Sequence, residues 1–464
     1  MNSDVWKATT IAPKVTTAAL LRALNATTLS CRGVDHERGK ISMRVAYRSV
    51  MCLTFAVVLS GLAGCSDGNS GAGGKAPDAG PKAKPESSAK AFDPPLKFGK
   101  AVKLAHDEDV KTWGFAPLGP KVFVRTDKGL DAYDTTSGRK LWSSALDRKD
   151  RYTGTEGVPN DDRSIPPVFA QQGERTEALF AYTDYAKGSG TGGDRTDVYL
   201  RAVDAGSGKV SWTTRLPAPA GMGISDMEPA VVGAENGTAV VTALASTNDS
   251  SEDSESAVTY AVDLSTHQVT WKQERFAAAA VDSGTVAGAQ VPDRATFGQL
   301  GAWHAEEGDL ALTGRAIADG TVRWKDEGHS SLEVNRVGGG LFATESRLHD
   351  IRTGKAVAGV DGAYITCYYD QQSVVVCGSD ETVRGVDTRS RKVLWTISKE
   401  DPSRKMPTIQ AAWHGAVYAN AAPDYVVLDA KTGKDRTTFS GPHLFLVNEY
   451  AGMDLDMVAY PATG

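Results

Sequence analysis

Residue types that commonly do chemistry are sparse in this chain, and they show no catalytic spacing. The 464 residues include five cysteines and eight histidines, but no CxxC pair and no H-E-x-x-H. A zinc site depends on such spacings, because its ligands must converge on one point. We therefore predict no catalytic residue, no metal site and no bound cofactor.

Two short motifs invite a ligand-binding interpretation. The stretch 188–193, GSGTGG, satisfies G-x-G-x-x-G, and residues 248–256, NDSSEDSES, offer four carboxylates to a cation. The first lacks the strand and helix that flank a dinucleotide site, and the second lacks the turn-forming glycine and the spacing of a calcium loop. We expect both to be solvated loops.

Two Trp-His pairs could suggest a catalytic histidine. Trp303-His304 and Trp413-His414 stand in the similar contexts GAWHAEEGDLAL and AAWHGAVYANAA. The shared context predicts the same place in a structural repeat, the first strand of a unit, and so favours a structural role.

Cys367 and Cys377 flank the turn in CYYDQQSVVVC. Two strands joined by that turn would place the cysteines nearly opposite each other, within reach of a disulfide. We favour this disulfide, with two buried free thiols as the alternative.

The N-terminal region has the layout of an export signal. Arg44 and Arg48 precede an apolar run over residues 50–62, which is shorter than the ~20 residues that span a bilayer. The next residues, Leu62, Ala63, Gly64 and Cys65, resemble a bacterial lipobox. This resemblance implies a signal peptide over residues 43–64, acylation of the Cys65 thiol and anchoring on the extracytoplasmic side of a cell membrane. A transmembrane helix is the alternative, and residues 1–42 are interpreted as an over-extended N-terminus.

Residues 65–94 are rich in Gly, Pro, Ala and Lys, and they cannot bury enough apolar surface to fold. We predict a flexible linker here, followed by a globular domain over residues 95–464. The formal net charge of the chain is −6, although residues 1–64 hold eight Lys/Arg against three Asp/Glu. Nonspecific nucleic-acid binding needs clustered positive charge, so the acidic body argues against a nucleic-acid partner.

The globular domain repeats one short unit. AYDTTSGRKLW (132–142) is echoed by AVDAGSGKVSW (202–212), AVDLSTHQVTW (261–271) and GVDTRSRKVLW (385–395), with weaker copies between and after them. Short β-rich stretches precede each copy, and no sizeable amphipathic helix is indicated. The recurrent positions, which we expect to be structural, are Asp134, Gly138, Trp142, Asp204, Gly208, Trp212, Asp263, Trp271, Gly320, Trp324, Asp350, Gly354, Asp387, Trp395, Asp429 and Gly433.

This unit resembles the pyrroloquinoline-quinone-type propeller repeat, which quinoprotein dehydrogenases share with BamB-type assembly lipoproteins. The resemblance implies an all-β propeller of four-stranded antiparallel blades, with the repeat as the hairpin of the third and fourth strands. The chain ends in a half unit, VAYPATG, and PLKFGKAVKLA (95–105) precedes the first unit. If that segment completes the last blade, it closes the ring and removes an exposed sheet edge. We predict eight blades, with seven as the alternative.

Strand alternation places first-to-second and third-to-fourth connections on one face of a propeller, and all other connections on the opposite face. Four long segments are predicted as insertions on that opposite face, over residues 149–165, 184–197, 247–257 and 277–295. Long loops commonly carry function, so a protein or cell-envelope partner is expected there.

The sequence thus predicts a monomeric lipoprotein whose propeller is a non-catalytic binding scaffold. The alternative is a quinone-dependent dehydrogenase. In those enzymes the family pattern includes a disulfide between adjacent cysteines and acidic and amide ligands for calcium, and this chain has no Cys-Cys pair.

Overall fold

The computed structural model describes residues 89–464 except 108–109, 111, 147–164, 187–194, 220–221, 225–228, 248–254, 299–300, 306–307 and 440. The predicted signal, the lipobox and most of the linker lie outside the described residues. Within the described part, no helix is long and apolar enough to cross a membrane. The regular structure of this part consists of β-strands, and its residues belong to one compact unit.

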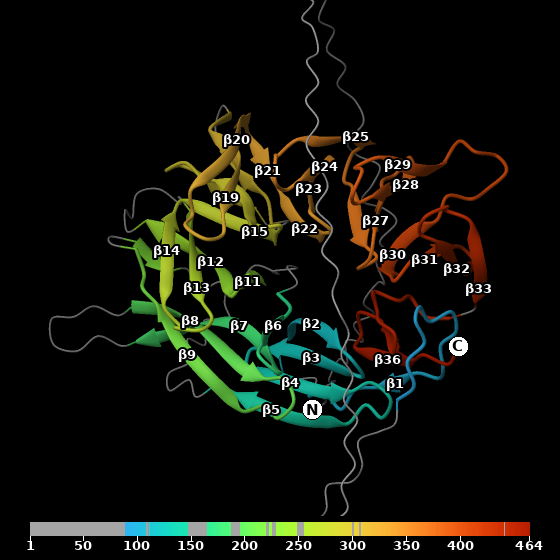
Figure 1. Ribbon diagram of the computed structural model, residues 1–464, viewed down its shortest axis with the longest axis horizontal. Coiled ribbons are helices and arrows are strands. Elements are labelled where there is room, and N and C mark those ends of the chain that lie inside the picture. The colour runs from blue at the N-terminus through green and yellow to red at the C-terminus, as the bar shows by residue number, and fades with distance from the viewer. Residues whose placement is uncertain are drawn as a thin grey trace, which may run out of the picture. The chain divides into compact units, whose positions relative to one another are not determined.

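Antiparallel four-stranded sheets follow one another around a ring (Figure 1). We name them sheet 1 to sheet 8 in chain order and give the strands of each from the inside outward. Sheet 1 is β2 (Thr112–Leu118), β3 (Lys121–Thr126), β4 (Gly129–Asp134) and β5 (Lys140–Ala145). Sheet 2 is β6 (Val168–Gln172), β7 (Arg175–Ala186), β8 (Arg195–Asp204) and β9 (Val210–Leu216). Sheet 3 is β11 (Ala230–Glu235), β12 (Thr238–Thr247), β13 (Glu255–Asp263) and β14 (Val269–Glu274), and β10 (Met222–Ile224) also pairs with β12.

The second half of the ring continues this order. Sheet 4 is β15 (Phe276–Asp282), β16 (Thr285–Gln290), β19 (Leu310–Ala316) and β20 (Val322–His329). Sheet 5 is β22 (Val334–Gly338), β23 (Leu341–Thr344), β24 (Arg347–Asp350) and β25 (Ala356–Asp361). Sheet 6 is β26 (Thr366–Tyr369), β27 (Val374–Gly378), β28 (Thr382–Asp387) and β29 (Val393–Ser398). Sheet 7 is β30 (Thr408–Trp413), β31 (Ala416–Ala421), β32 (Asp424–Asp429) and β33 (Asp435–Phe439).

Sheet 8 joins the two ends of the described chain. It contains β34 (Leu446–Val447), β35 (Ala451–Met453), β36 (Val458–Pro461) and, as its outermost strand, β1 (Val102–Lys103). Val102 pairs with Ala459, and an isolated bridge joins Phe98 to Ala462. The predicted all-β propeller, and its closure by the N-terminal segment, are confirmed. Eight such sheets lie in the described residues; the blade count, predicted as eight, stays a prediction.

Burial explains why these segments form strands at these places in the ring. β4 and β19 are buried along their whole length, because neighbouring sheets cover both of their faces. The outermost strand β14 alternates half-buried and exposed residues, as a strand with one solvated face does. Central strands are thus buried on both faces even where they carry polar residues such as Asp131, whereas outer strands keep one face in solvent.

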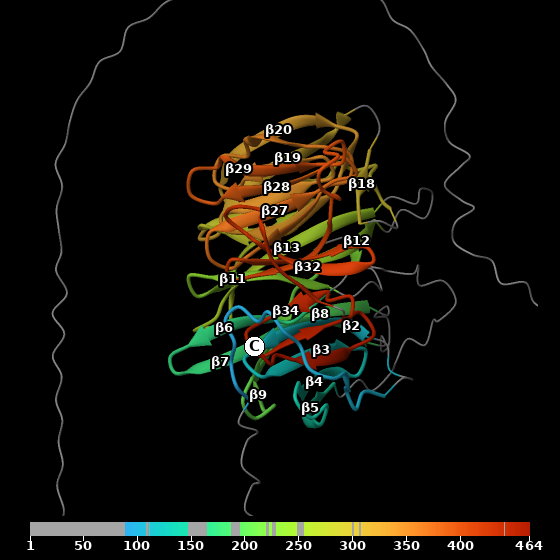
Figure 2. The same ribbon diagram turned by 90° about the vertical axis from the view of Figure 1, so that its right-hand side faces the viewer.

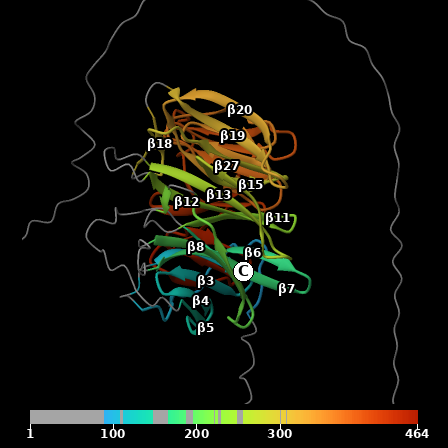
Figure 3. The ribbon, with the colours of Figure 1, turned by 90° about the vertical axis from the view of Figure 1, so that its left-hand side faces the viewer.

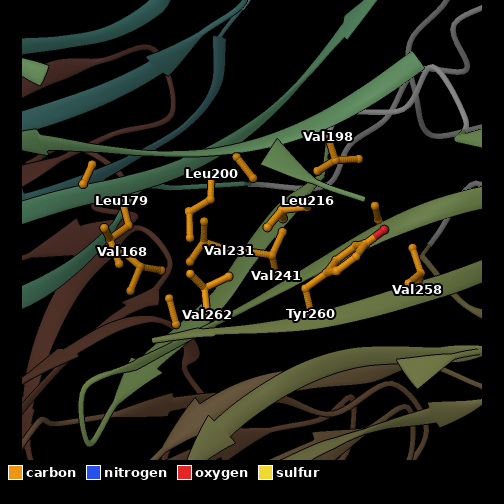
Figure 4. Packing of buried hydrophobic residues seen from close by; sticks show 14 of the residues in the cluster. Val168, Leu179, Val198, Leu200, Leu216, Val231, Val241, Val258, Tyr260 and Val262 are labelled. Carbon is orange, nitrogen blue, oxygen red and sulfur yellow. The ribbon is translucent and has the colours of Figure 1, made fainter. Parts of the chain in front are cut away.

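The hydrophobic core is divided among the seams between adjacent sheets. Figure 4 shows the seam of sheets 2 and 3, where Leu200 and Leu216 meet Val231 and Val241. The hydroxyl of Tyr260, at the edge of this seam, donates to the carbonyl of Pro217 at 2.8 Å. A comparable cluster, which includes Val122 and Met453, joins sheet 8 to sheet 1, so apolar packing as well as strand pairing closes the ring.

One predicted insertion is wrong. Residues 277–295 were expected to be a loop, but most of them form β15 and β16, the two inner strands of sheet 4. The segment is rich in alanine, which has low intrinsic strand preference. Small side chains suit the crowded centre of a ring, however, and tertiary packing overrides propensity here.

The insertion in sheet 4 instead lies between β16 and β19. It contributes β17 (Thr296–Phe297) and β18 (Trp303–His304), which form a three-stranded sheet with β21 (Ser331–Leu332). Figures 2 and 3 view the ring from two sides, and in both β18 lies at its edge. The other three predicted insertions fall largely on residues outside the described part.

Candidate functional site

The innermost strands of all eight sheets converge on one cavity. Its volume is about 1040 Å³, just above the roughly 300–1,000 Å³ of typical sites for small organic molecules. Each first strand contributes to the lining, for example through Phe115, Phe169, Val231, Ala278, Arg336, Tyr368, Trp413 and Leu446. The wall is mostly apolar, so any charged group in it stands out.

Five of these first strands are interrupted by a β-bulge, a point where one extra residue stands opposite a regular partner strand. The shifts in register lie between Thr112 and Gly114, Val231 and Gly233, Ala278 and Ala280, Arg336 and Gly338, and Ile409 and Ala411. A bulge leaves backbone groups without ladder partners and increases the local twist. The cavity wall is therefore irregular at these five strands, and at one of them the carbonyl of the bulged residue Val232 accepts a hydrogen bond from Arg336.

Arg336 is the cation of this wall. Arg336 occupies the position just before the bulged residue of its strand. At the equivalent position of three other bulged strands, the side chains of Val231, Ala278 and Ile409 are only 6, 4 and 7% exposed. Arg336 is instead exposed to the cavity, and its Nη1 donates to the carbonyl of the bulged residue Val232 at 3.4 Å. Desolvation by the surrounding wall lowers the pKa of the guanidinium, although the charge of Asp282 acts in the opposite direction.

The acidic and amide groups beside Arg336 are already engaged. Asn335 Nδ2 donates to Glu333 Oε1 at 2.7 Å. Asp282 Oδ2 accepts from the backbone nitrogen of Gly340 at 2.9 Å, and its Oδ1 accepts from Ser283 Oγ. Among the described residues, Arg336 forms no salt bridge.

Two tyrosines complete this side of the cavity. Burial raises the pKa of Tyr368, and burial together with the charges of Asp370 and Asp282 raises that of Tyr369. Both phenols are therefore neutral near pH 7 and can serve as hydrogen-bonding or apolar surface. Tyr369 packs so closely on Gly338 that a β-carbon there would lie 2.9 Å from its ring.

The two Trp-His pairs do not occupy equivalent places, and the expectation that they do is wrong. Trp303-His304 is β18 in the inserted sheet, whereas Trp413 ends β30, a true first strand, and His414 lies in the turn that follows. Both tryptophans line the cavity nevertheless.

Trp413 and His414 hold the N-terminal segment. Asp93 Oδ1 accepts from Trp413 Nε1 at 3.1 Å and lies 2.6 Å from His414 Nδ1. Two residues after Asp93, the backbone carbonyl of Pro95 accepts a hydrogen bond from Tyr418 Oη at 2.8 Å. These contacts belong to the turn between the first two strands of sheet 7, which places the described N-terminal residues on the same face as the repeat hairpins.

The recurrent aspartates all sit at the start of the hairpin between the third and fourth strands. Asp134 Oδ1 accepts from the backbone nitrogens of Thr136 and Ser137 at 3.0 and 2.8 Å, and Asp204, Asp263, Asp350, Asp387 and Asp429 hold their turns in the same way. At Asp263 these bonds, from Ser265 first, lower the carboxyl pKa to about 2. Sheet 4 has Ala316 at this position, and Asp319 caps the turn through Thr321 instead.

The recurrent tryptophans and glycines join one sheet to the next. The indole of Trp324 in sheet 4 donates to the carbonyl of Ile351 in sheet 5 at 2.9 Å. It also covers Gly354, where a β-carbon would lie 2.5 Å from the ring and where φ is +69°. The same contact pairs Trp142 with Gly208, Trp271 with Gly320 and Trp395 with Gly433, while Trp212 stacks on His267 at 4.5 Å.

Sheet 5 has no tryptophan at this position, and its seam with sheet 6 is built differently. Arg391 replaces the turn glycine of sheet 6 with φ +58°. Its Nε donates to Asp350 Oδ2 at 2.8 Å, and its Nη1 and Nη2 donate to the carbonyls of Gly339 and Gly340. A guanidinium thus takes the place of the indole.

Cys367 and Cys377 form a disulfide between β26 and β27, with their α-carbons 4.1 Å apart. Cys377 is buried, and Cys367 lines the cavity. The disulfide therefore ties the cavity wall of sheet 6 to the strand behind it.

The residues present do not match the quinone and calcium pattern of the resembled dehydrogenases. The disulfide joins cysteines ten residues apart rather than adjacent ones. Glu333 is the one carboxylate among the described lining residues, and no group of three His, Cys, Asp or Glu gathers anywhere in the described part. The predicted absence of a bound cofactor stays a prediction.

Sequence reasoning missed Arg336. The signal was present, because a charged residue stands in EVNRVGGG where three other bulged strands have Val231, Ala278 and Ile409, but recognising it required the strand alignment that only the bulges give.

No protein-family model matches the chain, and no curated protein matches it. Among solved structures, the quinohemoprotein alcohol dehydrogenase from Comamonas testosteroni is similar, with a TM-score of 0.38 and 12% identity. That match covers 78% of this chain and 71% of the dehydrogenase. The assignment of the fold rests on the strand topology described above.

Proposed function

We propose that this protein is an exported, lipid-anchored and monomeric propeller that binds a partner at the cell surface without catalysing a reaction. The observation that carries the proposal is the contrast between its two faces. Described residues 92–97 contact the turn face, through Glu449, His414 and Gly464. The inserted strands β10, β17 and β18 belong to connections of the opposite face.

An anchor at Cys65 would therefore reach the propeller from the turn face. The insertion-bearing face would point away from the membrane, toward partners in the cell envelope. This face also exposes two large apolar side chains, Tyr364 (69%) in the link from sheet 5 to sheet 6 and Leu455 (63%) between β35 and β36. Exposed aromatic and aliphatic groups of this kind are frequent contact residues in interfaces.

Site-specific photocrosslinking in cells tests the partner face. A photoreactive residue at position 364 or 455 should capture a partner. The same residue at position 352, an exposed arginine in the turn of sheet 5, should capture none. Crosslinks from position 352 alone would overturn the assignment of the face.

Metabolic labelling with palmitate tests the anchor. The label should be incorporated in the wild type, be lost in Cys65→Ala, and persist in Cys52→Ala, which changes a cysteine inside the predicted signal peptide. Undiminished labelling of Cys65→Ala would contradict the lipid anchor.

A further inference from the structure

We propose that the central cavity binds an organic carboxylate, with the carboxylate on the Arg336 guanidinium and an apolar body against the cavity wall. This goes beyond the scaffold role above and does not depend on it, because binding of a small ligand in the cavity requires no partner at the cell surface.

The first observation is the unused donor capacity of Arg336. A guanidinium has five N–H donors in a planar fork that fits a carboxylate bidentately. The described contacts of Arg336 include one hydrogen bond, long at 3.4 Å, to the carbonyl of Val232. Its acidic neighbours Glu333 and Asp282 already accept hydrogen bonds from Asn335, Ser283 and Gly340.

The second observation is that the strand does not need an arginine at this position. In three of the other four bulged strands this position is held by a buried apolar side chain, Val231, Ala278 or Ile409. Placing a charge among protein atoms is unfavourable unless something compensates for its lost hydration. Desolvation by the cavity wall lowers the pKa of the Arg336 guanidinium, and an anionic ligand beside it would compensate for the lost hydration.

The third observation concerns the rest of the cavity. Phe297, Trp303 and Tyr368 present aromatic surface to the same space, and Ala278 and Ala279 keep it wide. A volume of about 1040 Å³ exceeds what a small inorganic anion needs. An anion joined to an apolar body uses both the charge and the wall.

Isothermal titration calorimetry on the purified full chain tests the site. The ligand probes are 3-phenylpropionate and hexanoate, and the neutral amide 3-phenylpropanamide is their matched control. Both carboxylates should bind and the amide should bind at least about tenfold more weakly, because an ionised acceptor strengthens the hydrogen bonds of arginine. Equal affinity for acid and amide, or no binding of either carboxylate, would overturn the proposal.

Variants then assign the binding to this residue. Arg336→Leu should weaken carboxylate binding about tenfold to a hundredfold. Arg336→Lys should fall between Arg336→Leu and the wild type, because an ammonium keeps the charge but loses the fork. Arg352→Leu, on the turn face, should bind as the wild type does. If Arg336→Leu keeps its fold by circular dichroism and binds the carboxylates as tightly as the wild type, Arg336 is not the binding residue.

A last arm distinguishes the source of the carboxylate. Acetyl-Ala-Ala-Phe with a free C-terminus is compared with the same peptide amidated. Selective binding of the free acid identifies a peptide terminus as an acceptable ligand, whereas binding of 3-phenylpropionate alone identifies a small acid, and either result supports the site. These titrations need no cell-surface partner, so their failure and the failure of the crosslinking experiment are distinguishable.

Discussion

The turn face and the cavity wall are built on opposite plans. On the turn face the same Asp-capped hairpin recurs from sheet to sheet, and the indole of one sheet covers the turn of the next. Along the cavity wall the first strands differ in length, in the presence of a bulge and in side chains. The repeated contacts hold the ring together, and the non-repeated residues are the ones available for binding.

The seam between sheets 5 and 6 sharpens the comparison, because it departs from the repeat within the repeated face. Arg391 there reaches one aspartate and two glycine carbonyls instead of supporting an indole. At the turn of this seam a charged group therefore stands where the neighbouring seams have an indole, although apolar side chains such as Leu348 and Val375 also pack across it. Substitutions at these contacts should lower the free energy of unfolding by different amounts, from the indole that joins two sheets to a single capped turn.

Loss of an interlocking indole should have the largest effect. Trp324→Ala removes the contact with Gly354 and the hydrogen bond to Ile351, and it should lower the free energy of unfolding by about 3 kcal/mol. Denaturant melts measure this. Val322→Ala, on the same strand but 52% exposed, is the control and should stay close to the wild type. Equal losses in the two variants would show that the tryptophan does not join the sheets.

Loss of the disulfide should rank next. Opening the loop between Cys367 and Cys377 should remove about 2 to 3 kcal/mol, because the crosslink restricts the unfolded chain. The variant with both cysteines changed to alanine should melt like the reduced wild type. A reductant should lower the unfolding midpoint of the wild type and leave that of the variant unchanged. A lower midpoint in both proteins would contradict this account.

Arg391→Ala should cost about 2 kcal/mol near pH 7, because hydrogen bonds to charged groups are lost from a partly buried site. Burial alone would raise the pKa of Asp350, but the hydrogen bond and charge of Arg391 keep it below its usual value. Because the pKa of Asp350 is lower in the folded protein than in the unfolded chain, where it is about 3.9, its ionised carboxylate stabilises the fold at pH values above 3.9. This stabilisation is lost as the pH falls through the pKa of the folded protein.

The gap in unfolding free energy between the wild type and Arg391→Ala should therefore narrow below about pH 4. Arg352→Ala is the matched control, because Arg352 is 4.0 Å from the same carboxylate and its side chain is 63% exposed. A gap that does not change with pH would show that packing, rather than charge, dominates this seam.

A single turn should matter least, because the repeat has several. Asp134→Ala should lower the free energy of unfolding by about 1 kcal/mol through the loss of hydrogen bonds to Thr136 and Ser137. Asp134→Asn keeps an acceptor and should recover most of that loss. If the two variants melt alike, the carboxylate does not hold the turn.

The sequence by itself determined the strand-turn-strand unit, the all-β class and the segment that closes the ring. An Asp followed by a small polar turn and a glycine is a local pattern, and its hydrogen bonds span three or four residues. The pairing of β1 with β36 followed from counting strands, because a half unit at one end requires a strand from the other.

Only the tertiary structure decided what lies at the centre. β15 and β16 are alanine-rich strands that sequence propensity assigns to a loop, and the convergence of eight sheets on one axis makes small side chains favourable there. Arg336 likewise has no local motif; it becomes exceptional only when bulges align it with Val231 and Ala278. Contacts between residues distant in sequence leave no fixed spacing, so the candidate site could not be derived from the chain alone.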